Sequence, residues 1–157
     1  MTSAVITWLR FLLVLVFAGA FLGQLLVPVV AREQGDVFPE VEHLVVPYSI
    51  AGIAAIACLQ AGIVCVWALL TLIGDARIFT PRALRWVDAM AACGGAAAGI
   101  CALTAGHLLM TEGGGPGIVL AGFAAMVIGG TFVLLTVAMR GLLAAAIADR
   151  AELAEVI

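Results

Sequence analysis

Four long apolar segments alternate with short polar ones along this chain. The apolar segments cover about residues 11–31, 44–73, 87–110 and 117–139. Each has at least about 20 residues, the length that an α-helix needs to cross a hydrocarbon layer of about 30 Å. The pattern predicts an all-α, polytopic membrane protein in which residues 1–157 form a single domain, a bundle of four transmembrane helices.

The two ends of the chain need separate interpretation. In residues 140–157 apolar side chains recur at helical spacing while charged ones occupy the other face, which predicts that the fourth helix continues as an amphipathic tail. Near the other end, residues 18–20 resemble a signal-peptide cleavage site. The apolar segment around them continues to Val30 and is longer than a typical signal core, so we expect a retained transmembrane helix.

All seven cationic residues are arginines, and they are distributed unevenly between the polar segments. Six belong to segments that share one side of the membrane if there are four crossings, namely Arg10, Arg77, Arg82, Arg85, Arg140 and Arg150. Only Arg32 belongs to the other side. The positive-inside rule therefore predicts that the N- and C-termini are both cytoplasmic.

The polar segment between the second and third apolar segments carries the clearest local signal. Thr80 fits the N-cap and Pro81 the first position of a helix, so the third helix should begin before it enters the membrane. Arg85 is spaced to pair with Asp88 one turn later. The residues expected to contact lipid headgroups or a protein partner here are Arg77, Arg82, Arg85 and Trp86. Two interpretations stay open, a topology anchor that binds anionic lipid and a docking surface for a cytoplasmic partner.

Composition excludes several classes of function. Hydrophobic residues make up 65% of the chain and charged residues 11%, which requires a lipid environment. The net charge of −3 gives no basic face for nucleic acid. No charged residue lies near the middle of an apolar segment, although ion-coupled transport usually needs one there. No catalytic or phosphate-binding motif is found, so we expect no enzymatic activity and no cofactor.

A few polar and sulfur-containing residues remain as candidates for chemistry. His107, one turn from the end of the third apolar segment, and His43, in an acidic polar segment, are weak metal candidates because neither has a second ligand at a recognised spacing. Gln24 and Gln60 either line a site or form hydrogen bonds between helices. The four cysteines lie inside apolar segments and form no Cys-x-x-Cys motif, which favours a packing role.

Small residues recur every four positions in each apolar segment. They form the sets Gly19 and Gly23, Ala54, Cys58 and Gly62, Gly95 and Gly99, and Ala121, Ala125 and Gly129. Such faces allow helices to approach closely. They serve either to pack the four helices together or to join copies in a homo-oligomer, and the pattern favours internal packing.

Two stretches of the chain resemble a known family. Residues 79–86, beginning Phe-Thr-Pro and ending at Trp86, resemble the segment after the second helix in the domain of unknown function 2975 family, and so does the tail over residues 150–157. The resemblance implies a small bacterial cytoplasmic membrane protein with four helices. Some members are encoded beside small helix-turn-helix regulators, which makes a regulatory or partner-binding role plausible. The family implies no activity and no site residues.

These observations lead to one expected function and one alternative. We expect a non-enzymatic accessory or regulatory protein in contact with the lipid bilayer, which binds a partner through the arginine-rich segment, the tail or a small-residue helix face. The alternative is binding or transport of a small apolar or lipid-like molecule between the helices.

Overall fold

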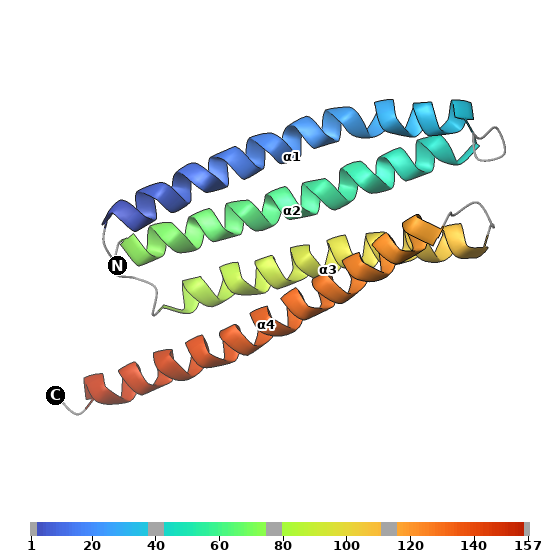
Figure 1. Cartoon of the computed structure of the whole chain (residues 1–157). Coiled ribbons are helices and arrows are strands. Elements are labelled where there is room, and N and C mark those ends of the chain that lie inside the picture. Colours follow the sequence, from blue (N-terminus) through green and yellow to red (C-terminus); the bar gives the residue numbers. More distant parts are fainter. Residues whose placement is uncertain (1–2, 38–42, 75–79, 111–115, 156–157) are drawn as a thin grey trace.

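The computed structural model describes residues 3–37, 43–74, 80–110 and 116–155, and these form four long helices (Figure 1). The helices are α1 (Ser3–Val37), α2 (Val45–Gly74), α3 (Pro81–Met110) and α4 (Pro116–Glu155). Each contains a stretch long and apolar enough to cross a membrane. The prediction of an all-α protein with four membrane-spanning helices is confirmed.

The helices pack in the order in which they occur in the chain. Contacts join α1 to α2, α2 to α3 and α3 to α4, and among the described residues no other pair of helices touches. Figure 1 shows the result, an open arrangement with α1 along one edge and α4 along the other. The start of α1 and the end of α4 lie at the same end of the structure.

Very few side chains are buried in this open arrangement. Eight described residues are buried: Leu44, Ser49, Cys65, Leu70, Ala83, Val87, Ala97 and Thr136. None of them belongs to α1. In a lipid environment this is expected, because lipid tails are as apolar as the side chains and burial alone gives helices no reason to associate. Close packing and hydrogen bonds between neighbouring helices must hold the fold together.

The start of α3 agrees with the sequence pattern. The helix begins at Pro81, and the backbone N–H of Ala83 donates a hydrogen bond of 2.9 Å to the carbonyl of Thr80. A residue whose carbonyl already accepts a helical hydrogen bond, while the residue itself lies outside the helix, is an N-cap. The predicted roles of Thr80 and Pro81 are confirmed.

The closest approach between helices is the seam between α3 and α4. A Cβ added at Gly129 would lie 2.5 Å from the Cβ of Ala98, and one added at Gly122 would collide with Ala105. A step of seven residues along α4 thus corresponds to a step of seven back along α3, as in an antiparallel heptad repeat. The two backbones approach so closely only because two positions on α4 carry no side chain.

The other small-residue faces are used less than their spacing suggested. A Cβ added at Gly23 would lie 4.0 Å from Cδ1 of Ile56, which is an ordinary van der Waals contact. Gly19, Gly62 and Gly99 have nothing within 4 Å of an added Cβ. These three positions therefore do not contribute to the packing of the four helices within one chain.

Candidate functional site

The arginine-rich start of α3 presents its cationic side chains outward. Arg82 and Arg85 are exposed, and Trp86 of the same helix is half-buried. Arg77 lies outside the described residues. The helical periodicity of α3 places Arg82 and Arg85 on one face, because they are three residues apart. This surface at the start of α3 offers two positive charges to a lipid headgroup or an acidic protein surface.

One ion pair links this region to α4, and it differs from the pair expected from spacing. The Asp88 carboxylate accepts a hydrogen bond from Nε of Arg140 on α4, whereas the sequence spacing suggested Arg85 as its partner. Side-chain exposures of 49% for Asp88 and 46% for Arg140 show a pair open to its surroundings. The register of the α3–α4 seam brings the two residues together. Asp88 therefore pairs with Arg140 and not with Arg85, whose side chain is exposed.

The same register shows how far α4 extends beyond α3. Gly129 lies opposite Ala98, and Arg140 pairs with Asp88. Continued without a break, the register places Ala146 opposite Pro81, the first residue of α3. Residues 147–155 of α4 therefore pass the start of α3 while remaining helical, as Figure 1 also shows. Within the described residues no other helix lies beside this end of α4, which is therefore available for another molecule.

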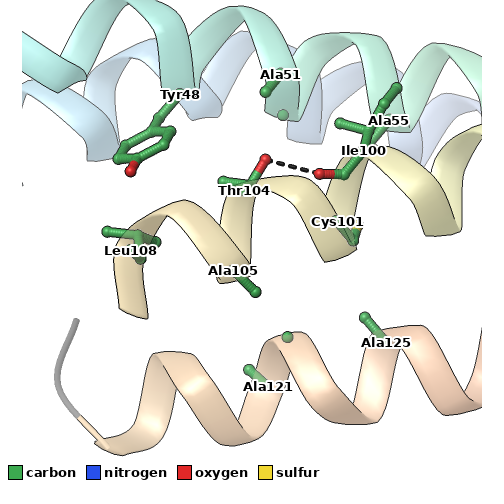
Figure 2. A pocket seen from close by; sticks show the side chains of 12 residues that line it. Tyr48, Ala51, Ala55, Ile100, Cys101, Thr104, Ala105, Leu108, Ala121 and Ala125 are labelled. Atoms are coloured by element: carbon green, nitrogen blue, oxygen red, sulfur yellow. Dashed lines mark hydrogen bonds between the residues drawn. The ribbon is translucent and has the colours of Figure 1, made fainter. Parts of the chain in front are cut away.

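A second region of interest is a cavity of about 270 Å³ among α2, α3 and α4. Figure 2 shows Ala105 of α3 pointing toward α4, from which Ala121 and Ala125 point back. Most of the other lining residues are small or apolar. The Thr104 hydroxyl donates a hydrogen bond of 2.8 Å to the carbonyl of Ile100, so it offers no free donor to a ligand. The cavity suits an apolar group and has little to orient a polar one.

Tyr48 and His107 meet beside this cavity. The Tyr48 hydroxyl lies 2.8 Å from Nδ1 of His107, and the two rings meet edge to face with centroids 6.1 Å apart. In the tautomer that is protonated on Nε2, the tyrosine hydroxyl donates to Nδ1. Tyr48 also lines the cavity. The 59-residue separation of Tyr48 and His107 in the sequence gave no sign of this contact.

The metal candidates remain separate in the structure. His43 is exposed in the turn before α2, whereas His107 bonds to Tyr48. In the described ranges, no three His, Cys, Asp or Glu residues lie close enough together to hold a metal ion. Cys65 of α2 and Cys93 of α3 lie near each other, a proximity that no sequence motif predicted.

The two intramembrane glutamines behave differently from each other. Nε2 of Gln24 on α1 donates a hydrogen bond of 3.3 Å to the carbonyl of Ile53 on α2, which links the two helices. Nε2 of Gln60 is buried without a hydrogen-bond partner. For Gln24 the structure therefore supports a hydrogen bond between helices and not a site-lining role. For Gln60 the side-chain amide nitrogen has no hydrogen-bond partner.

Comparison with known proteins gives one result. No curated protein and no solved structure is significantly similar to the chain. A family model described as protein of unknown function (DUF2975) matches residues 29–157. The match includes all of α2, α3 and α4, and with them both stretches that carry the sequence resemblance. The chain therefore belongs to the DUF2975 family of proteins.

Proposed function

We propose that the protein is a non-enzymatic accessory protein of the bacterial cytoplasmic membrane, with both termini in the cytoplasm, that binds a protein partner. The partner contacts the surface at the start of α3 and the end of α4. The observation that carries the proposal is the extension of α4 past Pro81, which leaves residues 147–155 helical but, among the described residues, without a neighbouring helix. A helical end of this length gains most of its stability when its apolar face packs against another molecule or helix.

Charge and polarity support this assignment. Arg82 and Arg85 are exposed close to the point where α4 leaves α3, so a partner with an acidic surface would find complementary charge there. Ile147 is half-buried and Asp149 exposed, so the amphipathic alternation expected for the tail continues as far as the described side chains reach. Arginine is also a residue type enriched in protein interfaces.

Affinity purification from native membranes tests the proposal. We expect the full-length chain to recover a partner at a fixed stoichiometry, and a chain ending at Ala146 to lose it. Truncation at this point leaves the α3–α4 seam intact, so the shortened chain should be extracted in folded form. A control chain carrying Arg32→Gln, at the opposite end of the molecule, should retain the partner. Recovery of the full chain alone, or equal recovery of a partner by the truncated chain, contradicts the proposal.

The orientation has its own test. In a background without the four native cysteines, a cysteine in place of Gly114 should react with a membrane-impermeant thiol reagent added outside intact cells. A cysteine in place of Ala76 should be protected until the cells are opened. Both positions lie outside the described residues, in the polar segments that join the helices. The reverse labelling pattern would place the termini outside.

A second candidate function is the binding of a small apolar or lipid-like molecule between α2, α3 and α4. The cavity of about 270 Å³ beside Tyr48 favours it, because ligand sites are concave and mostly apolar. Ala55→Leu fills the cavity from α2. If the protein carries such a molecule, mass spectrometry of organic extracts should find it bound to the parent chain and depleted in the variant. Equal amounts in the two samples would exclude this site.

A further inference from the structure

The pair of helices α1 and α2 contains a groove that the proposed function does not use. Its volume is about 330 Å³, and its lining residues are Leu13, Val14, Phe17, Ile63, Val64 and Trp67. All six side chains are apolar or aromatic. The groove is therefore suited to a hydrocarbon chain and offers nothing to a polar molecule along its length.

The end of the groove at Trp67 carries a positive charge with an unused donor. The guanidinium carbon of Arg10 lies 5.6 Å from the centroid of the Trp67 ring, in a cation–π arrangement. Nε of Arg10 is buried and has no hydrogen-bond partner. A buried donor that lacks an acceptor is costly, and more so when it carries charge. The Trp67 ring stabilises the charge of Arg10 but does not accept a hydrogen bond from its Nε–H, which lies in the guanidinium plane. An anionic group beside the guanidinium would offset this cost through its charge.

The position of this end along the helices matches the depth of a lipid headgroup. Arg10 lies seven residues after the start of α1, and Trp67 seven residues before the end of α2. At about 1.5 Å per residue, both are about 10 Å inside their helix ends. From there the groove runs toward the middle of the membrane, past Val14 to Phe17. Arginine and tryptophan are residues that prefer this interfacial depth.

We infer that this groove is a binding site for an anionic phospholipid. The phosphate pairs with the guanidinium group of Arg10, and one acyl chain lies in the groove between α1 and α2. The positive charge at one end and the apolar lining beyond it favour a molecule that joins an anionic headgroup to a hydrocarbon chain. A free phosphate lacks the chain, and a zwitterionic lipid carries a competing positive charge. The site is separate from the surface at the start of α3 and does not depend on a protein partner.

Fluorescence of Trp67 reports on this groove directly. Replacing Trp8 and Trp86 by Phe leaves Trp67 as the single tryptophan of the chain. The protein is reconstituted into vesicles in which either phosphatidylglycerol or phosphatidylcholine carries bromine on its acyl chains, and quenching of Trp67 is compared. We expect brominated phosphatidylglycerol to be preferred at Trp67 by about fivefold, the effect of one cation close to an anionic headgroup.

Two variants and two matched controls separate the site from ordinary lipid contact. Arg10→Gln removes the charge and Val64→Phe fills the groove, and each should reduce the preference to about one. Arg85→Gln removes an exposed charge at the start of α3, and Val46→Phe adds the same bulk at the other end of α2; both should preserve the preference.

Three outcomes would overturn the inference. One is the absence of any preference in the parent protein. Another is a preference that survives Arg10→Gln or Val64→Phe, which would assign it to bulk lipid. The third is a preference lost equally in Arg85→Gln, which would assign it to the overall charge of the protein. Circular dichroism of each reconstituted variant identifies loss of fold, and a variant that has lost helix is replaced by Arg10→Met or Val64→Leu.

Discussion

Gly129→Ala is the sharpest test of how α3 and α4 are held together. The added Cβ would lie 2.5 Å from the Cβ of Ala98, whereas ordinary contacts of this kind begin at 3.4 Å. The methyl group of Ala98 has no rotamer to change, so the two backbones must separate locally by about 0.9 Å. Overpacking of this kind costs about 1–3 kcal/mol. We expect the free energy of unfolding to fall by that amount.

The neighbouring residue provides the matched control. Gly130 has nothing within 4 Å of an added Cβ, so Gly130→Ala should change the free energy of unfolding by less than about 0.5 kcal/mol. The double variant Gly129→Ala with Ala98→Gly moves one methyl group from α3 to α4. It restores the space between the helices and should recover most of the lost stability.

Unfolding in mixed detergent micelles, followed by far-ultraviolet circular dichroism, measures all four proteins under the same conditions. The reasoning is refuted if Gly129→Ala is as stable as the parent chain, or if Gly130→Ala loses as much. Failure of Ala98→Gly to compensate would show that the loss has another cause than the collision between the two methyl groups.

Three further predictions concern the polar contacts between helices. In a double-mutant cycle with Asp88→Asn and Arg140→Gln, the coupling in unfolding free energy should be well below the cost of Gly129→Ala and should decrease as salt is added, because both side chains are about half exposed. Independence of salt would contradict this. Tyr48→Phe should lower the free energy of unfolding by about 1 kcal/mol, and combining it with His107→Phe should cost less than the sum of the two separate changes, since both remove the same hydrogen bond; additive losses would show that the bond is not shared. Gln24→Leu should cost about 0.6 kcal/mol by thermal unfolding in detergent, the usual value for an interhelical hydrogen bond in a membrane; an unchanged midpoint would exclude this bond.

The existence of the helices could be predicted from the sequence because it depends on local properties. Twenty apolar residues in succession have one stable form in lipid, and Thr80 followed by Pro81 marks a helix start through its own backbone chemistry. The extent of α1 was underestimated, since hydropathy detects the part in contact with hydrocarbon and not the helical turns beyond it: α1 covers Ser3–Val37, against an apolar segment over about 11–31. α4 has 40 residues and also extends beyond its apolar segment, but there the helical spacing of apolar residues in 140–157 predicted the continuation.

The pairing of residues between helices could not be predicted, and the reason is visible in α3. Residues 91–99 are small on every face, so spacing alone does not identify the face that meets α4. The pattern selected Gly95 and Gly99, but an added Cβ at Gly94 would collide with Phe132, while Gly99 has nothing near it. The Asp88–Arg140 and Tyr48–His107 contacts likewise depend on the register between helices, which no single segment contains.

In the part of the chain that the structure describes, each helix packs only against its neighbours in sequence, which gives the molecule a one-dimensional energetic structure. As in a repeat array, its stability is approximately a sum of terms for adjacent pairs, and a change in one interface should leave a distant one almost untouched. Such a molecule can also assemble in step with its synthesis. Each new helix can pack at once on the helix inserted just before it, so no segment has to wait in the membrane for a distant partner.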